Sequence, residues 1–171
     1  MALQQIKKTI RSIRDAFVQF IKNFGWIVAK ISGVQRKGFV DYNNIGMNTR
    51  TSILFREAES CVLTKSKGKI SITGSWKCRY SNKVIKDASD LDIDHIVPLQ
   101  YAKNNKIGIW TATSFQEFEN DTDNLVAVDK SLNRQKRDKS LVEWKPPKNQ
   151  SWYHSKWKEI CSKWTIEEPR K

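Results

Sequence analysis

Three consecutive segments in the second half of the chain constrain its fold most strongly. Residues 93–99 (IDHIVPL) and 124–129 (NLVAVD) are short, rich in apolar and β-branched residues, and predict two strands. Residues 130–144 (KSLNRQKRDKSLVEW) follow the second strand directly and predict a helix. The order strand, strand, helix, with polar residues where the strands begin and end, is the frame for the chemistry considered below.

The segments around this unit predict further helices and a small sheet. Residues 51–60 favour a short helix, and residues 61–86 alternate between apolar and polar in the manner of strands. The tail, residues 145–171, carries widely spaced tryptophans, which are more typical of packing than of recognition. We therefore expect an α+β fold in which the tail covers the core.

The N-terminal segment differs from the rest in its charge. Apolar residues recur at steps of three and four over residues 4–31, which predicts an amphipathic helix that Gly25 could divide into two. Residues 1–40 hold eight Lys or Arg against one acid, Asp15. Three roles are open: docking on the core, an arm that binds phosphates, or a helix on a membrane surface. We predict a basic helical extension over residues 1–45 and a second domain over residues 46–171.

The whole chain is strongly basic, with a formal net charge of +13 and a pI near 9.8 over 171 residues. This charge makes nucleic acid the first partner to consider and an anionic membrane the second. No run of 18 apolar residues is present, so no membrane span is expected. Basic residues interrupt the apolar stripe of residues 4–31, which argues against an export signal and predicts a cytoplasmic, intracellular protein.

The three cysteines stand far apart in the sequence and form no C-x-x-C pair. We expect Cys61, Cys78 and Cys161 to be free thiols, with a bridge between Cys61 and Cys78 as the alternative. Since their spacing does not match zinc-binding pairs, no structural zinc is expected.

The polar residues of the strand–strand–helix unit suit phosphodiester hydrolysis. That reaction needs a base for water, a cation for the phosphate and leaving oxygen, and a fixed orientation of the base. The imidazole of His95 has the ordinary pKa for the first task. Asp94 should lie on the opposite side of the strand, because side chains alternate along it. Asp94 and Asn133 together offer oxygen ligands, which suit Mg²⁺.

Other candidate residues have structural interpretations. His154 lies among aromatic residues with no acid nearby in sequence, so we expect it to be structural or exposed. The acids Glu119, Asp121 and Asp123 could form a second metal site, but local turn hydrogen bonds in the loop before the second strand are the preferred interpretation.

Over residues 50–165 the sequence resembles the HNH (ββα-metal, or His-Me finger) endonucleases. The resemblance rests on LDIDHIVPL, on NLVAV after END, and on NRQKRDKSLVEWKPP. GSWKCRY and the W-Y-x-x-x-W tail are also similar to a group of bacterial secreted nucleases of this type. The spacing of Asn124 and Asn133 is similar to that of the HNH domain in RNA-guided CRISPR nucleases. The first 45 or so residues carry no such resemblance.

The resemblance implies a role for each matching residue. His95 would be the general base, Asp94 a ligand of the divalent cation, and Asn133 the second ligand, where other members carry His. Asn124 would tie the loop between the strands and steady His95 through the backbone. Asp92 is either an outer acid of the metal site or a cap of the hairpin. Because all the implied ligands are oxygens, Mg²⁺ is the expected cofactor, with Mn²⁺ as a substitute.

A group of cations on the predicted helix completes the expected site. They would bind phosphates beside the cleaved bond, unless they only form a solvated basic face; they are Arg134, Lys136, Arg137 and Lys139.

The predicted function is that of a metal-dependent DNA endonuclease. One site per chain would nick one strand, and the chain would be a monomer or weak dimer. The alternatives are an inactive DNA-binding protein on a nuclease fold, or a non-specific DNase or RNase; sequence preference stays open.

Overall fold

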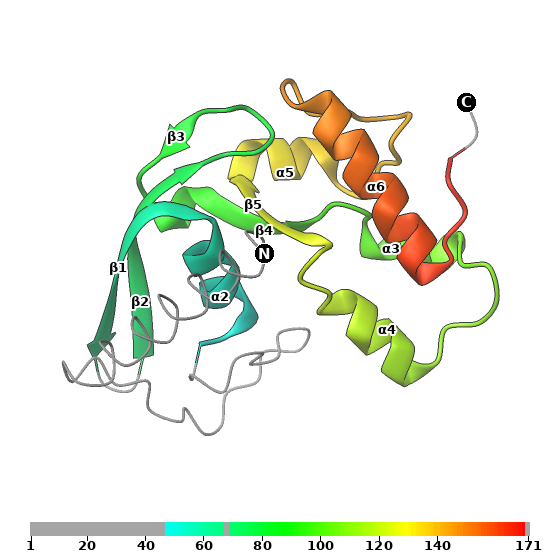
Figure 1. The fold of residues 1–171 in the computed structure, drawn as a ribbon, viewed down its shortest axis with the longest axis horizontal. Helices are drawn as coiled ribbons and strands as arrows, with labels where there is room; N and C mark the ends of the chain where they lie inside the picture. The colour runs from blue at the N-terminus through cyan, green and yellow to red at the C-terminus, as the bar shows by residue number, and fades with distance from the viewer. Residues whose placement is uncertain (1–46, 67–68, 170–171) are drawn as a thin grey trace, which may run out of the picture.

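The computed structural model describes residues 47–66 and 69–169, which form helices and two small antiparallel sheets (Figure 1). The predicted α+β class is therefore confirmed for these residues. The amphipathic helix predicted over residues 4–31 and the basic helical extension predicted over residues 1–45 lie outside the described residues, so both remain predictions.

The first part of the fold is a helix packed against a three-stranded sheet. Asn48 caps helix α2 (Thr49–Glu57) by accepting a hydrogen bond from the Thr51 backbone N–H. The sheet has the order β1-β2-β3, with β1 (Ala58–Ser66), β2 (Lys69–Lys77) and the short β3 (Val84–Ile85). The strands predicted within residues 61–86 are thus confirmed. The helix predicted over residues 51–60 ends earlier, because its last three residues begin β1.

The contact between α2 and this sheet is set by Trp76. Its indole is buried and donates a hydrogen bond to the Leu54 carbonyl, 2.7 Å away. On the same strand, a Cβ at Gly74 would lie 2.2 Å from the Ser60 carbonyl oxygen, so only glycine allows β1 and β2 to pair there. Trp76 belongs to a small apolar cluster with residues of α2, β4 and β5: Ile53, Leu54, Leu91, Leu125 and Ala127.

The second sheet is the predicted pair of strands. A 3₁₀ turn, η1 (Ala88–Asp90), leads into β4 (Leu91–His95), which pairs antiparallel with β5 (Leu125–Asp129). Helix α5 (Lys130–Lys136) follows β5 at once. The predicted order of strand, strand and helix is confirmed, although β4 and α5 both end earlier than expected.

The two boundary differences have local causes. Strand β4 ends at His95 rather than at 99, because Pro98 is the N-cap of the next helix. Helix α5 ends at Lys136 rather than at 144, because Arg137 adopts a φ of 54° and a ψ of −128° that no helix continues.

Two short helices occupy the connection between β4 and β5, for which a loop was predicted; that prediction is wrong. They are α3 (Leu99–Asn104) and α4 (Ala112–Glu119). Thr111 and Ser114 form a reciprocal capping box at the start of α4. These helices bring Glu119, at the end of α4, beside the end of β4.

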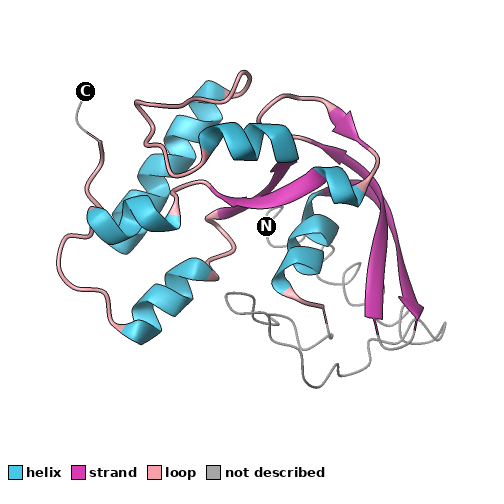
Figure 2. Ribbon diagram, turned by 180° about the vertical axis from the view of Figure 1, so that it is seen from behind, coloured by secondary structure: helices cyan, strands magenta, loops and turns pink. Residues whose placement is uncertain are grey.

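The C-terminal helix α6 (Gln150–Trp164) covers the main apolar core, as predicted for the tail. Figures 1 and 2 show it beside α3 and α5, on the part of the molecule away from β1 and β2. Tyr153 and Trp157 are buried, and Tyr153 meets Tyr80 edge to face with ring centroids 5.5 Å apart.

No helix among the described residues is long and apolar enough to span a membrane. All three cysteines are free, with Cys78 and Cys161 buried.

Candidate active site on strand β4

The centre of the site is the end of β4, where Asp94 and His95 follow each other. Their side chains point to opposite faces of the strand, as expected from the alternation of a regular strand. Asp94 faces helix α5, where it contacts Lys136, and His95 faces the end of α4, where it contacts Glu119. One residue step thus separates two chemically different faces.

On the α5 face, Asp94 is a buried carboxylate between two donors. The Tyr80 hydroxyl donates to its Oδ2 over 2.6 Å, and the Lys136 ammonium donates to its Oδ1 over 2.9 Å. Lys136 Nζ also donates to the His95 carbonyl oxygen, 2.7 Å away. Burial lowers the pKa of Lys136, and burial together with the negative charge of Asp94 raises that of Tyr80.

This arrangement corrects the role predicted for Lys136. Lys136 lies on the same side of α5 as Asn133, and β4 covers that side. Lys136 is completely buried and bound to Asp94, so it does not bind DNA phosphates. It is instead the cation that balances the buried carboxylate.

Asn133 lies one turn before Lys136 and contacts the other acid of the strand. Its Nδ2 donates to Oδ2 of Asp92 over 3.2 Å. The expected direct neighbour of Asn133, Asp94, is bound to Lys136 instead. Two contacts therefore join α5 to β4, and Asp92 belongs to this face rather than acting only as a cap of the hairpin.

The donor set of this face suits a hard cation with few protein ligands. Each oxygen of Asp94 accepts one hydrogen bond and retains a second lone pair, and the Asn133 side chain supplies an amide oxygen. The described residues contain no cluster of three or more His, Cys, Asp or Glu that could hold a metal. Mg²⁺ binds through one or two carboxylates and keeps its waters, so these oxygens fit it better than they fit Zn²⁺.

On the opposite face, His95 is a partly buried imidazole held by a backbone carbonyl. Its Nε2 lies 2.8 Å from the Glu119 carbonyl oxygen. Because a carbonyl only accepts, Nε2 carries the hydrogen and Nδ1 keeps its lone pair in the neutral ring. Burial lowers the pKa of His95 below 6.5, so the ring is neutral near pH 7. A neutral, oriented imidazole is the form that a general base requires.

Asn124 fixes the backbone that follows His95. Its Oδ1 accepts from the Val97 N–H over 2.8 Å, and its Nδ2 donates to the Val97 carbonyl over 3.1 Å. The Asn124 carbonyl also accepts from the Ile96 N–H. Asn124 is completely buried, so these bonds are shielded from water. The residue thus lies where the sequence predicted, between the strands and against the segment that leaves His95.

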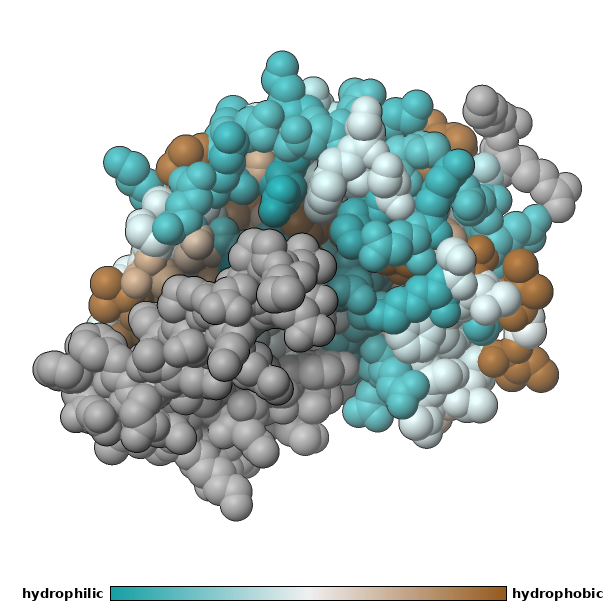
Figure 3. All heavy atoms as spheres, in the orientation of Figure 1, coloured by the Kyte–Doolittle hydropathy of each residue, from teal (hydrophilic) through white to brown (hydrophobic). Residues whose placement is uncertain are grey.

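The remaining predicted cations surround a concavity at the end of α5. It has a volume of about 500 Å³ and is lined by Arg134, Gln135, Arg137, Lys139 and Trp144. None of these side chains is acidic, so the concavity is positively charged. Hydrophilic side chains also dominate the upper surface over α5 and α6 (Figure 3).

Sequence reasoning missed several residues of the site. Tyr80 ends the run GSWKCRY that takes part in the resemblance, but no site role was predicted for it, and Glu119 acts through its backbone. His154 is exposed, in agreement with the sequence analysis. Asp121 makes the predicted local turn bond, accepting from the Asp123 N–H, but both acids also bind Lys163 of α6, which was not foreseen.

Comparison with known proteins gives one family match. The sequence pattern of the family described as "GmrSD restriction endonucleases, C-terminal domain" matches residues 49–170. This range contains every described residue of the site. The match supports the predicted relation to nucleases. No solved structure matches the chain.

One relative corrects the predicted location. An uncharacterized secreted protein of Arthroderma benhamiae is 36% identical to the chain over 119 residues, which are 67% of this chain and 57% of the relative. The chain thus matches a little over half of the length of that relative. The prediction of a cytoplasmic, intracellular protein is contradicted by this comparison. It rested on the basic residues within the stripe of residues 4–31, which are a weaker guide to location than a relative of this similarity.

Proposed function

The chain belongs to the family of the C-terminal domain of GmrSD restriction endonucleases, and from this premise we propose that it is a metal-dependent DNA endonuclease of the HNH type. The observation that carries the proposal is the neutral imidazole of His95, held at Nε2 by the Glu119 carbonyl on the strand that presents Asp94 to the other side. The strand, strand and helix of β4, β5 and α5 would be its ββα-metal core.

His95 would act as the general base. With Nε2–H donating to Glu119, the lone pair of Nδ1 can accept a proton from the water that attacks the phosphorus. The lowered pKa keeps this lone pair available near neutral pH. Asn124 would hold the backbone at Ile96 and Val97 so that the ring does not shift as it gains the proton.

Asp94 and Asn133 would hold Mg²⁺, or Mn²⁺ in its place, with Asp92 as a further acid beside Asn133. A bound divalent cation would supply charge stabilisation for the phosphate and the leaving oxygen. Lys136 and Tyr80 keep the Asp94 carboxylate in one orientation by binding one lone pair on each oxygen.

Arg134, Arg137 and Lys139 would bind backbone phosphates of DNA next to the site. They line a concavity without an acidic side chain, and such contacts position a duplex without reading its sequence. With one site in each chain, a monomer or a weak dimer would nick one strand per encounter.

The experiment is a plasmid assay. Supercoiled plasmid is incubated with Mg²⁺ and the wild type, His95→Ala or His154→Ala; His154 is exposed and outside the site, so it is the matched control. We expect open-circular product from the wild type and His154→Ala, no product with EDTA, and a rate lower by about 10²–10⁴-fold for His95→Ala. Equal rates for the wild type and His95→Ala would contradict the proposal.

Parallel substrates separate the alternative functions. Cleavage of RNA at the rate of DNA would identify a non-specific nuclease, and binding of plasmid without any cleavage would identify an inactive DNA-binding protein. Recurrent nick positions on a long defined DNA would identify a sequence-specific enzyme.

The similarity to a secreted relative supports action outside the cell. An assay of culture medium and cell lysate after expression of the full-length gene would test this. Activity confined to the lysate would contradict it.

A further inference from the structure

The turn between α4 and β5 follows Glu119, whose carbonyl binds His95, and side chains of helix α6 bind this turn. Glu119, whose carbonyl binds the imidazole, is the last residue of α4, and residues 120–124 lead into β5. Asn124 at the end of the turn binds the backbone of Val97. Any displacement of this short turn would therefore move both supports of His95 together.

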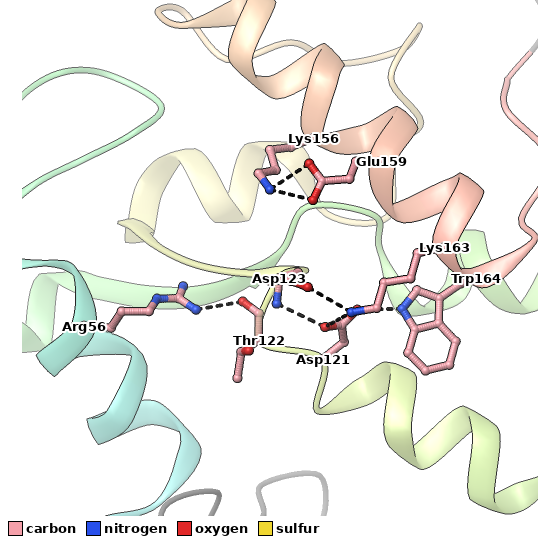
Figure 4. Close-up of polar contacts among 8 residues, drawn as sticks. All are labelled: Arg56, Asp121, Thr122, Asp123, Lys156, Glu159, Lys163 and Trp164. Atoms are coloured by element: carbon pink, nitrogen blue, oxygen red, sulfur yellow. Dashed lines mark hydrogen bonds and ion pairs between the residues drawn. The ribbon is translucent and has the colours of Figure 1, made fainter. Parts of the chain in front are cut away.

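The contacts with the turn come from the last turn of α6 (Figure 4). Lys163 Nζ lies 2.9 Å from Oδ1 of Asp121 and 2.9 Å from Oδ2 of Asp123. The indole of Trp164 donates to the second oxygen of Asp121. Asp121 is buried, and the hydrogen bond from Lys163 lowers the pKa of Asp123.

The other side of the turn is held from α2. Arg56 donates to the carbonyl oxygens of Thr122 and Leu125 over 2.8 and 2.7 Å. The turn is thus fixed from two helices that are distant in sequence. Arg56 binds the turn at Thr122 and Leu125, whereas Lys163 binds it at Asp121, which lies nearer in sequence to the Glu119 carbonyl that binds His95.

We propose that Lys163 is a positioning residue for His95, which it holds through Asp121, Asp123 and the Glu119 carbonyl. This inference rests on the proposed role of His95 as the base. Lys163 touches neither the imidazole nor the oxygen donors of the α5 face. Its effect is on the geometry of the turn, and it keeps the hydrogen of the neutral ring on Nε2 and the lone pair on Nδ1.

The structure offers a matched control on the same helix. Lys156 and Glu159 form an ion pair on α6 with a separation of 2.8 Å, and Figure 4 shows no contact between this pair and the turn. The charge of Lys156 acts on Asp123 only through space. The Lys156 side chain is 32% exposed and that of Lys163 is 44% exposed. Lys156→Gln and Lys163→Gln each remove one positive charge from a partly exposed side chain of the same helix. Lys163→Gln should cost more stability, because Asp121 is buried and loses its cation.

The test measures kinetics and the tautomer of His95. Nitrogen-15 NMR of the imidazole at pH 8, where the ring is neutral, reports whether Nε2 or Nδ1 carries the hydrogen. For Lys163→Gln we expect a mixture of tautomers and a kcat for plasmid cleavage lower by about 10- to 100-fold, with KM changed by less than about twofold. Lys163→Arg, which keeps both ion pairs, should restore the wild-type tautomer and most of kcat.

A milder variant covers the case in which Lys163→Gln does not fold. Asp123→Asn removes only the more exposed of the two ion pairs and should shift the tautomer and kcat in the same direction by a smaller amount. Lys156→Gln breaks no contact with the turn and should keep the wild-type tautomer and kcat.

The Nε2–H tautomer unchanged in Lys163→Gln, or equal losses in Lys163→Gln and Lys156→Gln, would overturn the proposal. If the wild type cleaves no nucleic acid, the proposed function fails, while the NMR comparison still decides whether Lys163 controls the ring.

Discussion

On the face of β4 that meets α5, Asp94 is a buried carboxylate paired with a buried lysine, whereas on the opposite face His95 is a neutral ring against a backbone carbonyl. The first face holds charge, and an ion pair balances it. The second face avoids charge, and burial with a single acceptor fixes a tautomer. A strand separates the two environments within one residue step, so neighbouring residues can have the different roles that we propose, metal ligand and base.

The largest expected effect is a loss of stability when the buried ion pair of the α5 face is broken. Lys136→Met leaves the charge of Asp94 buried without its cation and should lower the free energy of unfolding by about 3–5 kcal/mol. Arg134→Met, on the exposed side of the same helix, should change it by less than about 0.5 kcal/mol. Urea denaturation measures both. Equal losses would mean that the α5 face does not depend on its buried pair.

The His95 face depends on hydrogen bonds rather than on a charge pair. Asn124→Ala leaves the buried N–H and C=O groups of Val97 without their side-chain partner and should lower the free energy of unfolding by about 2–3 kcal/mol. It should also lower kcat, because the segment after His95 loosens. Asn104→Ala, at an exposed position, is the control. A stable Asn124→Ala variant with wild-type kcat would refute the role of Asn124.

The pH dependence distinguishes the neutral face from the charged one. Burial lowers the pKa of His95 in the folded protein below 6.5, so the stability from its neutral form is full above the unfolded pKa and is lost as pH falls through the folded pKa. The kcat/KM profile should therefore have an acidic limb with its midpoint below 6.5. His154→Gln should leave the profile unchanged. An acidic limb centred above 6.5 would show that His95 is not the buried base.

The smallest effect is expected at the exposed cations around the end of α5. Arg137→Gln and Lys139→Gln should weaken duplex binding by similar factors for all sequences, and each should reduce the slope of log affinity against log salt by about 0.9. Fluorescence anisotropy at several salt concentrations measures this, with Lys158→Gln on exposed α6 as the control. A slope equal to that of the wild type would exclude phosphate contacts at these residues.

The strand–strand–helix unit could be predicted because its signals are local. Apolar runs defined β4 and β5, and the alternation along a strand placed Asp94 and His95 on opposite sides. Helices α3 and α4 were missed because six and eight residues give little periodicity, and the capping box of α4 uses Ser114 where a Glu or Gln is the usual signal.

The partners of the site could not be predicted, because they depend on tertiary packing. Lys136 has the same charge as Arg134 and Lys139, and only the position of β4 shows that it is buried. The contact of Asn133 with Asp92 rather than with Asp94 depends on how far α5 is shifted along the strand. The ion pairs of Lys163 with Asp123 and Asp121 join residues 40 and 42 positions apart in the sequence, and no local pattern predicts them.

The most direct test of the central claim, that one face of β4 holds the metal and the other the base, is Mn²⁺ binding measured by calorimetry. The wild type, Asn133→Ala and His95→Ala are compared without nucleic acid. We predict binding weakened by at least about tenfold in Asn133→Ala and unchanged within about twofold in His95→Ala. Unchanged binding in Asn133→Ala, or an equal loss in His95→Ala, would contradict the separation of the two faces.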